Sequence, residues 1–270
     1  MDAIQTDVSD EALVIAIRAN MCDLFRHMSR SIPQEHFENG KFTRWYTPLP
    51  HPWFSGVLSA NLPEENDEAF IEETIQYFRV KEVNTFTWWM EPHLKRSDWE
   101  PALSNHGFEF SDGAPGMAVD LHEINESLRP ADGFEIRRVD DEESLRIWAK
   151  VFVNGYGLPP NWESLTFDSW MQLGLDLPLR NYLGYLNGKP VSTSTIFYGG
   201  GVAGIYCVAT LPEARGKGIG AALTLKPLLD AREMGYRIGV LQSSEMGFNV
   251  YKKLGFRHLC QIENFYKKNN

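Results

Sequence analysis

The chain reads Arg215-Gly216-Lys217-Gly218-Ile219-Gly220-Ala221 between an apolar, β-rich segment and a segment rich in alanine and leucine. The first segment predicts a strand over 202–209, and the second predicts a helix over 218–234 that Gly235 ends. Glycines at such a junction let the main chain approach a ligand, and the first N–H groups of a helix have no partners within it. The helix dipole adds roughly 0.3–1 kcal/mol of preference for negative charge. This junction therefore predicts a pyrophosphate site.

Other phosphate-binding loops share parts of this pattern. A P-loop requires GxxxxGK[ST], which the sequence lacks. A dinucleotide fold requires GxGxxG in the first βα unit, whereas these glycines are spaced GxGxG and follow a predicted hairpin. An ordinary glycine-rich turn is the remaining alternative. The basic residues Arg215 and Lys217 favour an anion site, and Arg215 is the better candidate for a bidentate contact with oxygens.

The segments around the loop predict an α/β domain. Upstream we expect a strand over 134–139, helices over 140–155 and 161–175, and strands over 182–186 and 191–198. Downstream we expect a strand over 237–242, a helix over 245–254 and a strand over 256–266. The element order is β-α-α-β-β-β-α-β-α-β. Antiparallel hairpins followed by a βαβ crossover predict a mostly antiparallel mixed sheet flanked by helices.

This arrangement resembles the GNAT superfamily of acyl-CoA N-acyltransferases, whose pyrophosphate signature [RQ]xxGxG/A is matched by Arg215, Gly218 and Gly220. The resemblance covers residues 134–266 and is most specific over 202–256. It implies acetyl-CoA, or another acyl-CoA, as cosubstrate, held by the backbone of the loop from Arg215 to Ala221. It also implies a bulge in the preceding strand, with the pantetheine arm bonded to main-chain groups of Cys207, Val208 and Ala209.

A second family feature is a helix ending in Tyr-x-x-x-Gly-Phe, present here from Tyr251 to Phe256. In family members the equivalent tyrosine protonates the departing thiolate, so Tyr251 is the implied general acid. The alternative is a tyrosine that packs the helix on the sheet. Seven residues before the tyrosine the family often has an Asn that contacts CoA, where this chain has Ser244. Asn249 is a further candidate contact.

The sequence does not identify a general base. Many relatives carry a Glu on one of the two central strands, and here neither strand has an acid. Glu245 begins the next helix, where a Glu more often complements the dipole. A water chain, or an amine that arrives neutral, would remove the need for a side-chain base. Cys207 could form a covalent acyl-enzyme, but a buried structural thiol is the favoured interpretation.

The first half of the chain repeats part of this plan. Residues 59–64 match 208–213 at an offset of 149, and residues 105–108 match 253–256 at an offset of 148. The sequence therefore predicts two tandem GNAT-like domains, over 1–131 and 132–270. The segment Glu64-Glu65-Asn66-Asp67-Glu68 replaces the glycine loop, and each acid would repel a negative charge 4 Å away by about 1 kcal/mol in water. We expect this degenerate copy not to bind CoA.

The aromatic residues of the first half could line a substrate pocket, but packing in the core is the favoured interpretation. They are Trp45, Tyr46, Trp53, Phe54, Trp88 and Trp89. The boundary between the halves is predicted in a linker over 128–133, after a helix-like segment over 121–128. Charge changes there, because residues 1–131 carry 10 Lys+Arg and 22 Asp+Glu, whereas residues 132–270 carry 16 and 14. This asymmetry supports two domains.

Composition restricts the partners. No basic stripe indicates nucleic acid, and the apolar runs are too short for a membrane span or a signal peptide, so a cytoplasmic protein is expected. The cysteines Cys22, Cys207 and Cys260 lack the spacing of a zinc site, so no metal is expected. Assembly as a homodimer stays open.

The resemblance implies transfer of an acetyl group from CoA to a primary amine by direct attack in a ternary complex. The acceptor is a small molecule or a peptide amine, and the acidic first half mildly favours a cationic one. In relatives the segment between the first two helices shapes the acceptor site, so Tyr156 and Trp162 are candidate substrate contacts. A non-catalytic acyl-CoA sensor is an alternative. A transferase that uses aminoacyl-tRNA is another, which the intact phosphate loop disfavours.

Overall fold

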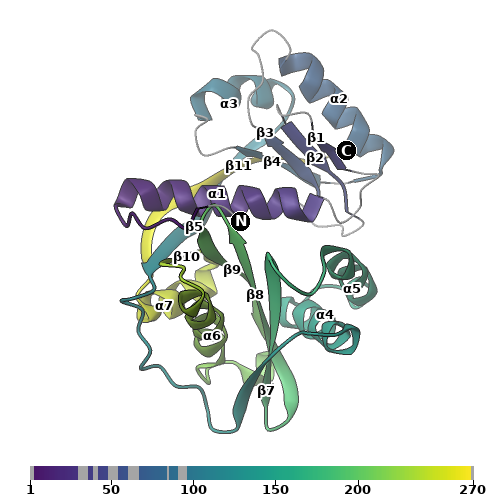
Figure 1. The fold of residues 1–270 in the computed structure, drawn as a ribbon. Coiled ribbons are helices and arrows are strands. Elements are labelled where there is room, and N and C mark those ends of the chain that lie inside the picture. The colour runs from purple at the N-terminus through teal and green to yellow at the C-terminus, as the bar shows by residue number, and fades with distance from the viewer. Residues whose placement is uncertain are drawn as a thin grey trace. The chain divides into compact units, whose positions relative to one another are not determined.

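The computed structural model describes residues 3–29, 36–38, 42–47, 54–59, 67–83, 85–90 and 96–268. Its contacts divide the chain into two compact units (Figure 1). Unit 1 consists of residues 1–24 and 114–260, and unit 2 consists of residues 25–113 and 261–270. Helix α1 (Asp10–Ser29) and strands β5 (Glu109–Asp120) and β11 (Arg257–Lys268) run from one unit into the other. The predicted boundary after residue 131 divides the two sequence repeats and not these two contact-defined units, so it stays a prediction.

Unit 1 contains the sheet in which the glycine loop lies. In chain order its further elements are β6 (Phe134–Arg138), α4 (Glu142–Tyr156), α5 (Trp162–Leu173), β7 (Leu179–Leu186), β8 (Lys189–Gly199), β9 (Val202–Thr210), the short 3₁₀ helix η3 (Pro212–Ala214), α6 (Ile219–Glu233), β10 (Ile238–Gln242) and α7 (Glu245–Leu254). The strand order is β5-β10-β9-β8-β7-β6. Only the β9–β10 pair among these described strands is parallel. The predicted element order and mixed sheet are confirmed.

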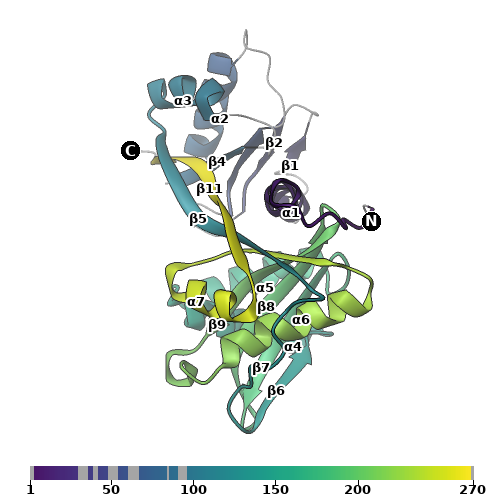
Figure 2. The ribbon, with the colours of Figure 1, turned by 90° about the vertical axis from the view of Figure 1, so that its left-hand side faces the viewer.

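Helices cover both faces of this sheet. α4 and α5 lie on one face, and α6 and α7 on the other (Figures 1 and 2). Under α6 and α7, a core cluster includes the fully buried Ile196, Leu228 and Leu254. On the opposite face Trp148 packs against Trp170, with ring centroids 5.3 Å apart. This packing fixes the start of α6 and the end of α7 against the same face.

Unit 2 has the same kind of sheet on a smaller scale. Its elements are β1 (His36–Glu38), β2 (Phe42–Trp45), β3 (Gly56–Ser59), α2 (Asp67–Val80), β4 (Thr85–Met90) and α3 (Arg96–Asn105), with parts of α1, β5 and β11. The strand order is β1-β2-β3-β4-β11, with β3 and β4 parallel. Trp45, Trp88 and Trp89 are at most 2% exposed, which supports core packing over a pocket. Tyr46 and Phe54 are half-buried, and Trp53 lies outside the described residues.

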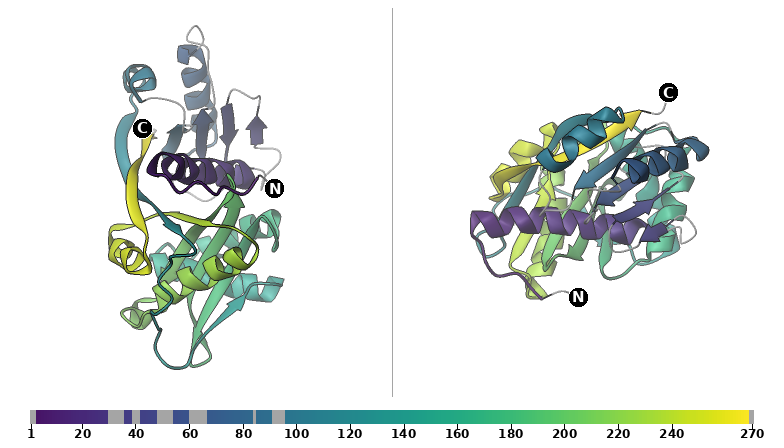
Figure 3. Two further views of the ribbon diagram at one scale, coloured as in Figure 1. Left: turned by 60° about the vertical axis from the view of Figure 1, so that its left-hand side comes forward. Right: turned by 90° about the horizontal axis from the view of Figure 1, so that it is seen from above.

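The two halves of the chain repeat one plan and exchange their last strands. α7 begins and ends 149 residues after α3, and β11 begins and ends 148 residues after β5. β4 and β10 are equivalent, because each pairs in parallel with the strand before it. Yet β5 of the first half pairs antiparallel with β10, and β11 of the second half pairs antiparallel with β4. The predicted tandem arrangement is confirmed, and β5 and β11 run side by side (Figure 3).

The helix predicted over 121–128 is wrong, because these residues form turns and irregular structure. Its apolar spacing has another cause: Leu121 and Ile124 fill the core of unit 1. Asn125 caps the end of α7: its N–H and its Nδ2 each donate a hydrogen bond of 2.9 Å to the last carbonyls of that helix. The following segment packs too, and the Ala131 N–H donates to the Lys217 carbonyl over 2.9 Å. The chain before β6 therefore supports the glycine loop.

Candidate functional site

The glycine loop presents main-chain amides at the start of α6. Gly218 is the N-cap residue, its φ of 73° lies in the left-handed region, and no side chain caps it. A Cβ at Gly218 would lie 2.8 Å from the Arg129 carbonyl oxygen, so only glycine fits there. At Gly220 nothing lies within 4 Å of the Cβ position. The first turn is thus uncapped by a side chain and open at Gly220, where a ligand could approach the main chain.

The other residues of the loop have distinct places. Ile219 and Ala221 are buried in the core of unit 1, so they offer a ligand their N–H groups. Gly216 has a φ of 74° and open space at its Cβ position. Lys217 is exposed, and its Nζ donates to the Glu213 carbonyl over 3.0 Å. Because the Lys217 side chain is exposed, it can turn toward an anion without disturbing the core.

The Arg215 side chain is hydrogen-bonded to main-chain carbonyls outside the loop. Its Nε donates to the Thr210 carbonyl and its second terminal nitrogen to the Gly155 carbonyl, each over 3.0 Å. These bonds join the loop to β9 and to the end of α4, where a Cβ at Gly155 would lie 2.8 Å from the Ala209 Cβ. The expected bidentate contact of Arg215 with phosphate oxygens stays a prediction. In the structure, Arg215 fixes the direction in which the loop leaves the sheet.

Strand β9 separates from β10 before the loop. Their parallel pairing covers Gly239 to Leu241 and ends at Ile205, although β9 continues to Thr210. On its other edge β9 still pairs with β8, with a register shift after Thr193. Among the described pairings, the β10-side edge of Val208 and Ala209 has no strand partner. This is the opening in which the resemblance places a pantetheine arm.

Cys207 forms the bulge that was expected in this strand. Its φ is 53°, which a non-glycine residue rarely adopts, and its carbonyl accepts a hydrogen bond of 2.9 Å from Thr193 Oγ1. Burial raises the pKa of the Cys207 thiol to about 12. A thiol that keeps its proton at neutral pH is a poor nucleophile, which supports the structural role of Cys207.

Tyr251 lies at the end of α7 with 9% of its surface exposed. Burial raises its pKa to about 12, and a hydrogen bond with the Thr224 side chain opposes part of that rise. Its ring packs on its own helix, because a Cβ at Gly247 would lie 2.7 Å from the ring. A phenol in this state holds its proton at neutral pH, which is the form that a general acid requires.

Tyr156 belongs to the same neighbourhood. Half of its surface is exposed, at 52%. Burial raises the pKa of its hydroxyl well above the usual value, with smaller contributions from Cys207 and Tyr251. The structure thus brings together Tyr156, Cys207 and Tyr251. Trp162, the other predicted substrate contact, is 8% exposed and packs at the start of α5.

The predicted CoA contacts Ser244 and Asn249 lie at the start of α7 and on its surface. Ser244 is its N-cap, and the Ser244 Oγ accepts from the Gly247 N–H over 3.2 Å, which leaves its own proton available for donation. Asn249 is exposed on the helix surface. Glu245 is exposed in the first turn, where a carboxylate complements the dipole. Their roles toward CoA stay predictions.

Sequence reasoning missed the contribution of α1. Asn20 is fully buried, and its Nδ2 donates to the Gly199 carbonyl over 2.9 Å. Its Oδ1 accepts a hydrogen bond of 2.6 Å from Tyr206, the residue before the bulge. Burial raises the pKa of Tyr206, and the Asp23 carboxylate, also on α1, adds to the rise. An Asn on the apolar face of α1 was the signal that could have indicated this contact.

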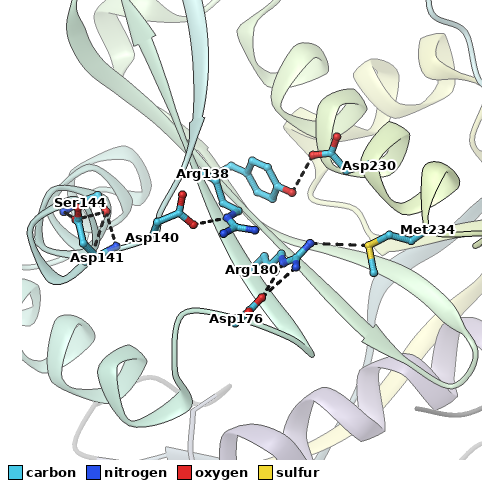
Figure 4. A network of polar contacts seen from close by, with 9 residues as sticks. Arg138, Asp140, Asp141, Ser144, Asp176, Arg180, Asp230 and Met234 are labelled. Carbon is cyan, nitrogen blue, oxygen red and sulfur yellow. Dashed lines mark hydrogen bonds and ion pairs between the residues drawn. The ribbon is translucent and has the colours of Figure 1, made fainter.

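A separate polar network joins the first strands of unit 1 to the end of α6 (Figure 4). Arg180 pairs with Asp176 over 3.0 Å, and Asp230 accepts a hydrogen bond of 3.0 Å from Tyr182. Arg138 pairs with Asp140. Opposite charges satisfy one another here, so the network supports the fold and offers no reactive group.

Known proteins share features of this sequence and fold. A model of the acetyltransferase (GNAT) family matches residues 143–256, which include the loop, the bulge and Tyr251. Residues 143–256 therefore form a GNAT domain. The comparison with curated proteins gave no match.

Solved structures show that the GNAT likeness in fold extends over both halves. The chain is similar to a GCN5-related N-acetyltransferase from Kribbella flavida, with a TM-score of 0.63 and 14% identity, covering 92% of this chain and 95% of that one. It is similar to a tandem GNAT protein from the clavulanic acid biosynthesis pathway, with a TM-score of 0.57, 14% identity and coverages of 84% and 78%. A GCN5-related N-acetyltransferase from Sphaerobacter thermophilus gives a TM-score of 0.58, 16% identity and coverages of 84% and 76%.

The described residues show no sign of a metal site or of a membrane span. They contain no group of three or more His, Cys, Asp or Glu side chains arranged to hold a metal ion. In the same residues, no helix combines the length and apolar character of a membrane span.

Proposed function

We propose that unit 1 transfers an acetyl group from acetyl-CoA to a primary amine of a small molecule or a peptide. One observation carries the proposal: uncapped amides at the start of α6 lie beside the separated edge of β9, in the same unit as the protonated Tyr251. An anion cradle, an open strand edge and a proton donor are what a CoA thioester needs for binding and cleavage. Membership of the GNAT family supports acyl transfer as the chemistry.

The residues present fit an acyl-CoA. The N–H groups of the loop from Arg215 to Ala221 would hold the diphosphate, with Lys217 adding positive charge. Main-chain groups of Cys207, Val208 and Ala209 would hold the pantetheine arm as a neighbouring strand would. Ser244 and Asn249 are further proposed contacts.

The proposed reaction is direct attack. The amine nitrogen forms a bond to the carbonyl carbon, the bond from that carbon to sulfur breaks, and Tyr251 passes its proton to the departing thiolate. The attacking nitrogen loses its extra proton to water, unless Asp23 or Glu245 takes it through a water. Tyr156 is exposed beside Cys207 and Tyr251, so we place it against the acceptor. Trp162, being buried, would act there only by supporting α5.

We propose that unit 2 does not bind CoA. Its helix α2 stands in the place of α6 and begins with Asp67 and Glu68. The Glu68 carboxylate in this first turn would repel an anion there. Residues 64–66, the rest of the acidic segment, lie outside the described residues.

Two measurements test the proposal. A thermal-shift titration with acetyl-CoA should raise the melting temperature, because a ligand at 100 times its Kd stabilises by about 2.7 kcal/mol. Thiol release is then followed with a panel of primary amines, including cationic ones and peptides. Binding without turnover on any amine would favour a sensor of acyl-CoA, and no binding would reject the site itself.

A further inference from the structure

Gln242, the last residue of β10, carries a buried hydrogen-bond donor that has no acceptor. Its side chain is half-buried, and its Nε2 is enclosed and has no hydrogen-bond partner among the described residues. Such a group destabilises the folded protein unless a water or a ligand reaches it. Other buried groups of unit 1 also lack a partner, Ser194 Oγ among them, so the position of the Gln242 amide decides its meaning.

The register of the sheet places Gln242 at the fork, the point where β9 separates from β10. The last parallel pair joins Leu241 to Ile205, and both side chains belong to the core cluster under α6 and α7. Successive side chains of a strand point to opposite faces, so Gln242 and Tyr206 lie on the other face, each one residue beyond that pair. On β5 the residue opposite Gln242 is Gly116, which has no side chain to pair with it.

The neighbouring phenol does not take this donor. The Tyr206 hydroxyl donates its own proton to Asn20 Oδ1 over 2.6 Å. Burial raises the pKa of Tyr206, and the Gln242 side chain opposes part of that rise, as an amide on the same face would. No hydrogen bond of normal geometry joins Nε2 to the phenol oxygen, however. The amide of Gln242 therefore remains a donor at the fork.

We propose that Gln242 donates a hydrogen bond to the carbonyl oxygen of the bound acetyl thioester and stabilises the negative charge that develops there. This inference rests on the proposed function, in which Cys207, Val208 and Ala209 hold the pantetheine arm through their main chain. An arm that runs from the start of α6 along these residues brings its thioester to the fork.

The chemistry of acyl transfer requires such a donor. As the amine nitrogen bonds to the carbonyl carbon, the electron pair of the carbon–oxygen π bond moves onto oxygen. The Gln242 N–H stabilises this charge without giving up its proton. The electron pair returns when the bond from carbon to sulfur breaks, and Tyr251 protonates the thiolate. Because the charge exists only during the reaction, the contact raises kcat more than it raises the affinity for the thioester.

The main chain around Gln242 is fixed before any ligand arrives. Leu241 pairs with β9, and Gln242 itself pairs with β5. The Ser243 N–H donates to the Pro115 carbonyl over 2.9 Å, which holds the residue after Gln242. A donor that is buried and already in place needs little reorganisation when charge appears on its partner.

The first test replaces the amide by an apolar side chain. Gln242→Met keeps the length of the side chain, and Gln242→Leu repeats the test with a branched one. Both should lower kcat about 100-fold or more, the usual effect of losing one such donor. The affinity for CoA without an acetyl group should change less than about twofold, because it has no thioester carbonyl.

Urea unfolding of the ligand-free proteins separates this role from a structural one. Both variants should be at least as stable as wild type, because an unpaired buried amide is removed. Ser194→Ala is the matched control, since Ser194 is fully buried and its Oγ also lacks a partner, but it lies on β8 and not at the fork. It should keep the wild-type kcat. Lower stability of both Gln242 variants would identify a structural amide and overturn the inference.

Infrared difference spectra of bound, isotope-labelled acetyl-CoA test the hydrogen bond without turnover. A donor lowers the stretching frequency of the thioester carbonyl, so this frequency should rise in Gln242→Met and stay unchanged in Ser194→Ala. Equal frequencies in wild type and Gln242→Met would overturn the inference and leave the proposed function intact, provided that the wild type transfers acetyl groups. A wild type that does not bind acetyl-CoA would overturn both.

Discussion

The Tyr206 hydroxyl on β9 donates a hydrogen bond of 2.6 Å to Asn20 Oδ1 on α1, across 186 residues of sequence. Through Nδ2 the same Asn20 side chain donates to the Gly199 carbonyl over 2.9 Å and to the Phe197 carbonyl over 3.3 Å. One buried amide thus fastens α1 to the β8–β9 hairpin immediately before the bulge at Cys207. The N-terminal helix is therefore part of the framework that positions the GNAT site.

Asn20→Ala should lower the free energy of unfolding by about 1–3 kcal/mol, because the Tyr206 hydroxyl and the hairpin carbonyls lose their buried partner. Tyr206→Phe removes only the hydroxyl and should cost about 0.5–1.5 kcal/mol. Urea denaturation followed by circular dichroism gives both values. Equal stability of wild type and Asn20→Ala would show that α1 is not fastened in this way.

Gly220→Asp should weaken binding of acetyl-CoA at least about tenfold, because it places a negative charge among the amides of the first turn. The fold should tolerate it, since the Cβ position at Gly220 is open and an Asp in the first turn favours the helix. Gly220→Asn is the matched control of similar size without charge. Titration calorimetry measures both affinities, and similar values for the two variants would remove the diphosphate from this turn. Gly218→Asp is less informative, because its Cβ would strike the Arg129 carbonyl.

Tyr251→Phe should lower kcat about 10²–10⁴-fold, the usual size of general acid catalysis, with little change in the affinity for acetyl-CoA. Burial raises the pKa of Tyr251 to about 12, so the wild-type acid stays protonated through pH 9 and no alkaline loss of kcat should come from it below that pH. Steady-state kinetics from pH 6 to 9 checks both statements. Equal turnover of the variant would exclude Tyr251 from the mechanism.

Cys207 should resist alkylation. Burial raises the pKa of its thiol to about 12, so the reactive thiolate is scarce at pH 9, and its fraction rises only as the pH approaches 12. With iodoacetamide at pH 9, the thiolate fraction of Cys207 is on the order of 1000-fold below that of a cysteine peptide, so Cys207 should react much more slowly. Peptide mapping by mass spectrometry gives the rate, and rapid modification of the folded protein would revive the nucleophile hypothesis.

A fragment of residues 132–270 should not fold alone. It contains the matched GNAT segment but lacks β5, so β10 would lose its antiparallel neighbour and expose an edge. Coexpression with residues 1–131 should restore a soluble complex, because that fragment supplies β5. Circular dichroism and gel filtration decide the outcome, and a stable monomer of 132–270 would contradict this account.

Local patterns predicted the second half of the chain closely. The helix expected over 245–254 has those bounds as α7, and the expected strand over 134–139 lies within a residue of β6. Glycines at turns and helical periodicity suffice to predict an element whose bounds depend on its own residues. They failed over 121–128, where the apolar spacing reflects contact with a core and Asn125 caps another helix.

Long-range contacts of the site could not be read from the sequence. Arg215 matches the phosphate signature, but its side chain binds two main-chain carbonyls. Asn20 belongs to the half of the chain that was expected to be separate, yet it bonds the hairpin of the GNAT domain. Such contacts depend on tertiary packing, which no local window contains.

The reciprocal pairing of β5 and β11 has a consequence for synthesis on the ribosome. β5 is complete at Asp120, but its partner β10 begins only at Ile238, and unit 2 waits for β11 until Lys268. The sheet of unit 1 cannot close before β10 has been synthesised, and the sheet of unit 2 cannot close before β11 has been synthesised, so unpaired strand edges stay accessible for much of translation. A nascent-chain chaperone that covers these edges would protect the protein until β10 and β11 have been synthesised and can pair.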